Sequence, residues 1–328
     1  MSTGNGQREA VIVGGLRTPF GRRGGQLAGW HPVELLSFTL KGLIEQTGVD
    51  PAAIEDVIAG CVDQVGEQAL NVARNAWLDA GLPESTPATT VDRQCGSGLQ
   101  ALQFAAQGVM AGGYDLAIAC GVESMTRVPL GSNVLSAEQR PMTPAVRARY
   151  GVDQFNQAVG AEMIAREWGL SREALDEYSA RSHALAAQAT ARGWLREEIL
   201  PLPIEGGTMQ ADQGIRPDTS REKLASLKPA FDGLELLTAG NSSQISDGAA
   251  ALLVASREKA EELGLRPQAR FVAFTQVGSD PVRMLTGPIP ATRKVLQRAG
   301  LTTDDIDLFE VNEAFAPVCL AWQEELGV

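Results

Sequence analysis

The sequence contains an internal repeat that limits the folds it can adopt. Residues 48–57 (GVDPAAIEDV) and 300–309 (GLTTDDIDLF) match in spacing, and each follows an amphipathic helical pattern, at residues 35–44 and 291–299. The offset between Gly48 and Gly300 is 252 residues. Self-similarity of this kind predicts two copies of one structural unit, each with the same series of strands and helices. The second copy is shorter, because 22 residues follow Ile306.

Short apolar runs alternate with helical patterns through the first part of the chain. The pattern predicts an α/β fold, because strands and helices follow one another in turn. A loop is expected between Leu16 and Trp30, and His31 is expected to cap the helix that begins at Pro32 and ends near Gly48. Further strands are expected at 10–15, 56–61 and 88–91, with a helix at 71–80.

The stretch 91–123 predicts a turn, a cysteine, a helix and a strand, in that order. Cys95 precedes Gly96 and a helical pattern that ends at Gly112. A helix start favours an anion, so the thiol there is biased towards the thiolate that attacks carbonyl carbon. The alternative is a small buried cysteine without a chemical role.

The composition changes after residue 123. Proline, glycine and charged residues become frequent, and helices are expected at 156–168 and 171–192. This predicts a first domain at 1–123, an inserted loop domain at 124–237, a return to the first domain at 238–266 and a second domain at 267–328. The insertion carries a basic cluster, interpreted either as a phosphate or nucleotide contact or as a solvated face: Arg216, Arg221, Lys223 and Lys228.

Charge and composition exclude several classes of protein. The 28 Lys and Arg residues against 40 Asp and Glu give a net charge of −12, which argues against nucleic-acid binding. The N-terminal sequence does not resemble a signal peptide and no stretch is apolar enough to span a membrane, so a cytoplasmic location is expected. The four cysteines are dispersed, which disfavours a zinc site or a disulfide framework. His183 is interpreted as a solvated histidine on a helix.

Four blocks resemble the signature motifs of the thiolases, the acyl-CoA C-acyltransferases, and they occur in the family's order. They are VDRQCGSGLQ at 91–100, GVESM at 121–125, LTAGNSSQISDGA at 237–249 and VNEAFA at 311–316. The resemblance runs from about residue 10 to the end of the chain. It implies a layered αβαβα fold made of two related halves, the second incomplete, with an inserted loop domain that holds coenzyme A.

The resemblance also implies a reaction and the residues that perform it. The reaction is thiolytic cleavage of 3-ketoacyl-CoA or the reverse Claisen condensation, with Cys95 as the acyl carrier and Asn312 holding a water at an oxyanion. Coenzyme A would meet Ser243, Ser226 and Arg216. Acyl-CoA and coenzyme A are substrates, so no permanently bound cofactor and no metal are expected. Homodimers or homotetramers are usual for the family. Residues 156–158 lack the His-Met-Gly of biosynthetic acetyl-CoA members, which indicates a different acyl chain preference. A degradative role is expected for the chain.

Two blocks of the family, one with a Gly-His-Pro motif and one rich in Cys and Gly, are not found in the 328 residues. The sequence is therefore interpreted as a C-terminally truncated thiolase with low activity, since these blocks supply acid–base groups. Cys319 does not fit the missing block and is expected to belong to the core. Two alternatives are a ketoacyl synthase-like condensing enzyme and a non-catalytic acyl-CoA-binding fragment or subunit.

Overall fold

The computed structural model describes residues 8–135 and 141–328, so the N-terminal polar tail lies largely outside the described residues. The chain forms two compact units. The first comprises Met1–Ala137, Gly193–Gly214 and Ile245–Phe271, and the second comprises Glu138–Arg192, Ile215–Gln244 and Val272–Val328. Each unit is described separately.

The first unit is built on a seven-stranded mixed sheet in the order β4-β3-β5-β8-β1-β9, with β2 paired to β8. β3, β4 and β5 run parallel to one another, whereas β8 runs antiparallel to both β5 and β1. The strands are β1 (Ala10–Arg17), β2 (Gly21–Arg22), β3 (Asp56–Gly60), β4 (Ala88–Val91), β5 (Leu116–Ser124), β8 (Ser246–Ser256) and β9 (Ala269–Arg270).

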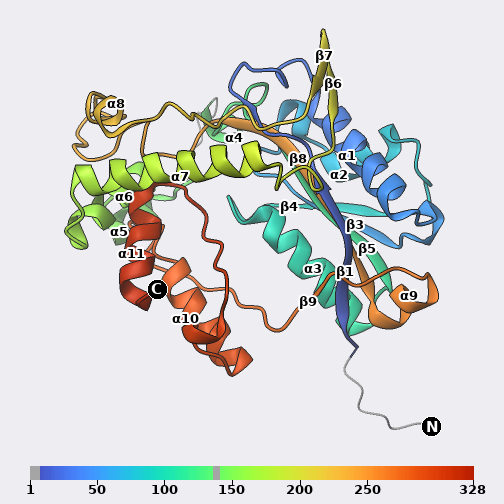
Figure 1. The fold of residues 1–328 in the computed structure, drawn as a ribbon. Helices are drawn as coiled ribbons and strands as arrows, with labels where there is room; N and C mark the ends of the chain where they lie inside the picture. Colours follow the sequence, from blue (N-terminus) through green and yellow to red (C-terminus); the bar gives the residue numbers. More distant parts are fainter. Residues whose placement is uncertain (1–7, 136–140) are drawn as a thin grey trace. The chain divides into compact units, whose positions relative to one another are not determined.

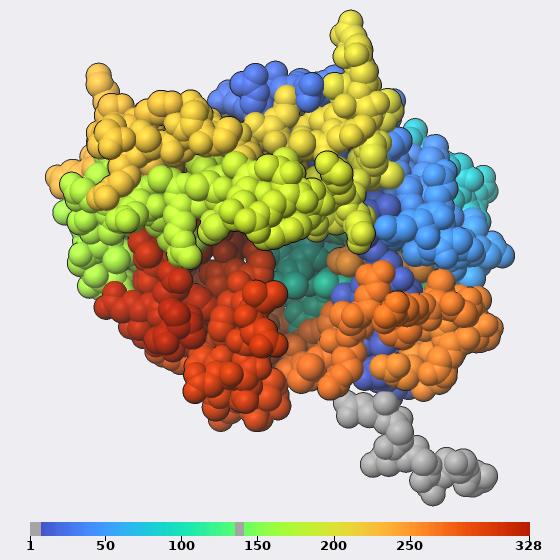
Figure 2. Space-filling model, viewed as in Figure 1, coloured from blue at the N-terminus to red at the C-terminus, as the bar shows by residue number. Residues whose placement is uncertain are grey.

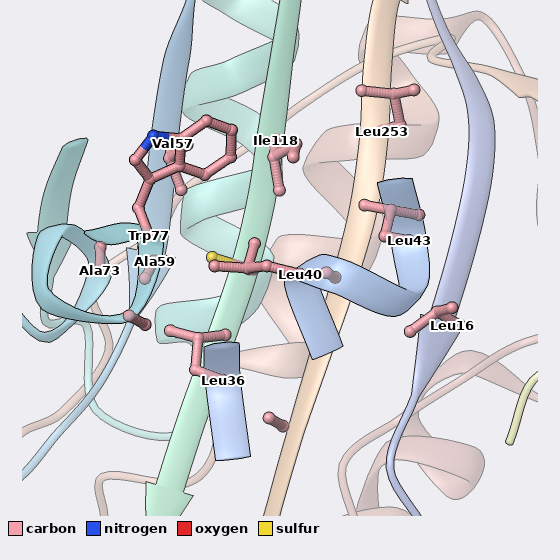
Figure 3. Close-up of a cluster of buried hydrophobic side chains, with 14 of the residues drawn as sticks. Leu16, Leu36, Leu40, Leu43, Val57, Ala59, Ala73, Trp77, Ile118 and Leu253 are labelled. Atoms are coloured by element: carbon pink, nitrogen blue, oxygen red, sulfur yellow. The ribbon is translucent and has the colours of Figure 1, made fainter. Parts of the chain in front are cut away.

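Helices cover both faces of this sheet. Figure 1 shows α1 (Pro32–Thr47) and α2 (Val72–Asp79) on one side and α3 (Ser97–Ala111) on the other. Strand residues alternate between the faces. Val57 and Ala59 join the cluster under α1 and α2, where Leu36 and Leu40 of α1 lie over the strands, as Figure 3 shows. The result is three layers, which matches the α/β prediction.

The helix ends of the first unit follow the predicted signals. His31 accepts a hydrogen bond from the Val33 amide through Nδ1 (3.2 Å), and Gly48 ends α1 with φ = 66°. A glycine suits that position because side chains disfavour left-handed backbone. The helix predicted at 71–80 is α2, one residue shorter at each end, and Asn71 is its cap, with Oδ1 accepting from the Arg74 amide. The capping role predicted for His31 is therefore confirmed.

The loop predicted between Leu16 and Trp30 is partly wrong. β1 continues to Arg17, and Gly21 and Arg22 form β2. The reason is the length of β8, whose eleven residues pair with both segments and satisfy their backbone groups. This unit also contains α4 (Ser132–Leu135), α9 (Arg257–Glu262) and a hairpin of β6 (Leu202–Ile204) and β7 (Gly207–Met209). Figure 2 shows the hairpin projecting from the surface.

The second unit is mainly helical. Its apolar core lies among α6, α7 and α11, and it buries Leu175, Leu237 and Phe315. The helices are α5 (Pro144–Tyr150), α6 (Gln157–Glu167), α7 (Arg172–Arg192), α8 (Arg221–Ala225), α10 (Pro288–Ala299) and α11 (Ala316–Leu326). The helices predicted at 156–168 and 171–192 are confirmed within one residue at each end, as α6 and α7.

The internal repeat is confirmed in part. α10 and the 3-10 turn Thr303–Asp305 repeat α1 and the 3-10 turn Pro51–Ala53. The strand expected next is missing, since residues 306–314 form no strand, and Leu308 is exposed. In the first copy β3 lies between two strands, whereas residues 306–314 have no neighbouring strand in the described chain. Without neighbours the backbone groups cannot form a ladder.

A search of the described residues for a helix with the length and apolar character needed to cross a bilayer finds none.

Candidate active site

Cys95 lies at a sharp turn just before α3. Gly96 is the N-cap of this helix, so Cys95 stands one residue before it, and its side chain is exposed. Gln94 has φ = 49°, a left-handed conformation that is uncommon for a residue with a side chain. Such conformations persist where the surrounding structure fixes them, and they are frequent at functional sites.

Ser97 fixes this turn. Its buried hydroxyl donates to the Gln94 carbonyl (2.6 Å) and accepts from the Arg93 amide (2.8 Å). The Ser97 amide also donates to the Gln94 carbonyl (2.9 Å), and the Gly96 amide donates to the Arg93 carbonyl (3.1 Å). The backbone on both sides of Cys95 is therefore held by short-range hydrogen bonds.

The end of β3 touches the first turn of α3. A Cβ added to Gly60 would lie 2.3 Å from the carbonyl carbon of Ser97 and 2.4 Å from the nitrogen of Gly98. Real Cβ atoms do not approach backbone so closely, so Gly60 is what lets the helix start against the sheet. This contact joins residues 37 positions apart in sequence, Gly60 and Ser97, and the local pattern around Gly60 does not reveal it.

The other three cysteines differ from Cys95. Cys61, Cys120 and Cys319 are buried. Burial raises the pKa of Cys120 to about 12. Burial, followed by the nearby Glu123 carboxylate, raises the pKa of Cys61, and burial raises the pKa of Cys319. These thiols stay protonated and enclosed, so Cys95 is the thiol available to a substrate. The prediction that Cys319 belongs to the core is confirmed.

Asn312 belongs to the second unit and is exposed in the irregular segment that precedes α11. The thiol of Cys319 lies 3.8 Å from the Asn312 carbonyl oxygen and 3.7 Å from that of Val311. Glu313 is held by α7, because Tyr178 and Ser182 donate to its two carboxylate oxygens (2.8 and 2.9 Å).

The Ser243 loop docks beside the Asn312 segment. The Ser243 amide donates to the Ala314 carbonyl (2.9 Å), and the Ala316 amide donates to the Asn241 carbonyl (3.0 Å). Asn241 is buried and donates to Asp176 (3.1 Å). Ser243 itself is exposed. Two residues predicted to act in one reaction, Ser243 and Asn312, therefore lie on directly bonded segments.

Ser226 ends α8 and donates its hydroxyl to the Lys223 carbonyl (2.7 Å). Its segment lies against the Ser243 loop, since a Cβ on Gly240 would meet Leu224 at 2.4 Å and Leu227 at 2.7 Å. The structure thus brings Ser226, Ser243 and Asn312 into one packed group of segments.

Arg216 is exposed, and its amide donates to Nδ1 of His183 (3.2 Å). Burial, followed by the charge of Arg216, lowers the pKa of His183. The interpretation of His183 as a solvated histidine is wrong, because this side chain is half-buried and supports the segment that carries Arg216. Its helical position alone could not reveal this partner.

The basic cluster is paired in part. Lys223 donates to Asp218 (2.5 Å), and Arg221 lies 3.9 Å from Glu177. The Arg216 side chain has no ion-pair partner in the described part of the chain. It is therefore available to a ligand. Within the same ranges, no group of three His, Cys, Asp or Glu side chains could hold a metal ion.

Comparison with known proteins decides the family. The model of the thiolase N-terminal domain matches residues 10–258, and that of the thiolase C-terminal domain matches residues 265–328. The chain belongs to the thiolase family. It is an acyltransferase of the thiolase type, and the ketoacyl synthase and non-catalytic alternatives gain no support from these similarities.

Curated relatives and a solved structure agree with this assignment. The thiolase is 47% identical to a steroid 3-ketoacyl-CoA thiolase of Mycobacterium tuberculosis, over 99% of this chain and 82% of the relative. It is 41% identical to a 3-ketoacyl-CoA thiolase of Bacillus subtilis, over 98% of this chain and 84% of the relative. The crystal structure of the Bacillus anthracis acetyl-CoA acetyltransferase matches with a TM-score of 0.89 at 36% identity, over 99% of this chain and 85% of that one. The predicted thiolase-like layered fold is confirmed.

Proposed function

We propose that this thiolase works in the degradative direction and cleaves 3-ketoacyl-CoA with coenzyme A, through an acyl-thioester on Cys95. The observation that carries the proposal is the exposed thiol of Cys95 on a fixed turn, while the other three thiols are buried. The names of the two relatives, both 3-ketoacyl-CoA thiolases, support this direction.

The reaction has two steps. The Cys95 thiolate attacks the 3-keto carbon, and the bond between carbons 2 and 3 breaks. The acyl group stays on sulfur as a thioester, and the bonding electrons leave as the enolate of acetyl-CoA, which takes up a proton at carbon 2. The thiol of coenzyme A then attacks the thioester, releasing a shortened acyl-CoA and restoring Cys95.

Asn312 would act on the leaving group. Breaking the carbon–carbon bond places negative charge on the thioester oxygen of the departing acetyl-CoA. A donor fixed at that oxygen lowers the barrier, and one such donor is worth about 3 kcal/mol. We assign this role to a water molecule held by the Asn312 side chain, whose exposure leaves it accessible.

Coenzyme A would bind along the packed segments of the second unit. Ser243 would meet the pantetheine arm, and Ser226 would lie beside the nucleotide. The Arg216 guanidinium would stack against adenine, because a planar delocalised cation suits a flat ring. Its lack of an ion-pair partner in the described chain supports this assignment.

Two variants test the assignment by separating the steps. Cys95→Ala should abolish both cleavage of a 3-ketoacyl-CoA and acyl transfer from acetyl-CoA to the protein. Asn312→Ala should slow cleavage by about 100-fold and leave acyl transfer from acetyl-CoA unchanged, because that transfer forms no enolate. Cleavage at the wild-type rate by either variant would overturn the corresponding role.

The quaternary structure, location and domain division remain predictions. A homodimer or homotetramer is proposed from the family resemblance, and light scattering coupled to gel filtration would measure its mass. A cytoplasmic location is proposed from the sequence, and cell fractionation would test it. Residues 124–237 are proposed as the inserted coenzyme A-binding domain, and hydrogen exchange with and without coenzyme A would map the protected segments.

A further inference from the structure

The segment that carries Asn312 depends on contacts from outside itself. Residues 306–314 form neither helix nor strand, so no regular ladder fixes the backbone at Asn312. An exposed side chain on an irregular segment samples many positions unless its neighbours are anchored. Asn312 therefore keeps one position only through contacts that its neighbours make.

One set of anchors acts after Asn312. Phe315 is buried in the apolar core of the second unit, and its neighbours bond to the Ser243 loop through Ala314 and Ala316. On the other side, the Cys319 thiol approaches the carbonyl oxygens of Val311 and Asn312. These contacts hold the backbone at Val311, Asn312 and the residues that follow, and one further contact joins the segment to α7.

Glu313 supplies that contact. Tyr178 donates to its Oε1 (2.8 Å) and Ser182 donates to its Oε2 (2.9 Å). The two donors are four residues apart and share one face of α7. Because each carboxylate oxygen receives its own hydroxyl, the plane of the carboxylate is defined as well as its position. Hydrogen bonds to a charged acceptor are stronger than those between neutral groups.

Both donors belong to a well-fixed helix. Tyr178 packs against the core of the second unit, and burial, followed by hydrogen bonding with Cys319 and Glu313, raises its pKa. Its hydroxyl thus remains a donor. α7 also carries His183, which accepts from the amide of Arg216. Figure 2 shows the surface of α7 directly beside the C-terminal segments of this unit.

We infer that Glu313 is a positioning residue for Asn312, acting through the hydroxyls of Tyr178 and Ser182. This inference rests on the proposed role of Asn312 in stabilising the enolate. Glu313 touches no reacting atom in this account. It holds the peptide next to Asn312 against a rigid helix, so that the side-chain amide keeps its orientation during carbon–carbon cleavage.

The test combines cleavage kinetics with hydrogen exchange in the full chain. Glu313→Ala should lower kcat for cleavage about ten-fold, with the KM for coenzyme A and acyl transfer from acetyl-CoA unchanged. Amides of residues 311–314 should exchange faster. Glu313→Gln should lose less, since its amide oxygen still accepts one of the two hydroxyls. A Tyr178→Phe and Ser182→Ala double variant should reproduce Glu313→Ala.

Glu310→Ala is the matched control, because it removes an exposed carboxylate three residues earlier that makes no hydrogen bond to α7 in the described part of the chain. It should leave both measurements at the wild-type level. Unchanged exchange at 311–314 in Glu313→Ala, or equal effects from Glu310→Ala, would overturn the inference. Either result would leave the proposed function intact. Only cleavage at the wild-type rate by Asn312→Ala would contradict the role of Asn312.

Discussion

Replacing Gly60 with alanine tests how tightly the cysteine turn is built against the sheet. The new Cβ would lie 2.3 Å from the Ser97 carbonyl carbon, whereas ordinary contact begins at 3.4 Å. β3 and the start of α3 must therefore separate by about 1 Å, the difference between these distances. Overpacking of this kind costs about 1–3 kcal/mol of unfolding free energy.

The displacement should also slow the acylation of Cys95. A shift of about 1 Å at a reacting group can lower a rate about 100-fold, so Gly60→Ala should acylate Cys95 far more slowly than the wild type. The assay is the time course of acyl transfer from acetyl-CoA, read by mass spectrometry, together with urea unfolding. Gly29→Ala is the control, since a Cβ there meets nothing within 4 Å. Wild-type stability and acylation in Gly60→Ala would refute the argument.

Two further predictions concern the second unit. The pKa of His183 lies below its ordinary value, so the unfolded chain binds a proton at a higher pH than the folded chain does. Stability should therefore fall as the pH drops below about 6.5. His183→Asn should flatten this part of a plot of melting temperature against pH, and an unchanged plot would contradict the prediction. Glu162 is buried and accepts from the Leu236 amide (3.0 Å) and its neighbours. Glu162→Ala should therefore lower the unfolding free energy, measured by urea titration, by about 2–3 kcal/mol. Glu177→Ala, at an exposed position, should change it little, and equal losses in the two variants would contradict the prediction.

Local signals in the sequence predicted much of the first unit. His31 before Pro32 caps α1, and Gly48 after the last helical turn ends it, through neighbours within a few residues. Asn71, predicted as the first residue of its helix, caps α2 from the position just before it. The same holds for the turn at Cys95, where Ser97 bonds to residues three and four positions away. Such contacts leave patterns that can be read without knowing the fold.

Contacts between distant residues could not be predicted in this way. β2 forms because β8, more than 200 residues later, offers it a partner. Gly60 likewise lies close to Ser97, and Tyr178 donates a hydrogen bond to Glu313. No sequence pattern links the two residues of either pair. The strand expected after α10 does not form, for the opposite reason. Its sequence pattern is present, but the described residues contain no strand beside it.

The whole proposed reaction depends on Cys95 carrying the acyl group. The most direct measurement is peptide mass mapping after incubation with acetyl-CoA and an acid quench. We expect an acetyl mark on the Cys95 peptide, its removal by added coenzyme A, and no mark on the buried Cys61, Cys120 or Cys319. Cys95→Ala should carry no mark. Coenzyme A binding without acylation, or a mark on another residue that coenzyme A removes, would contradict the account.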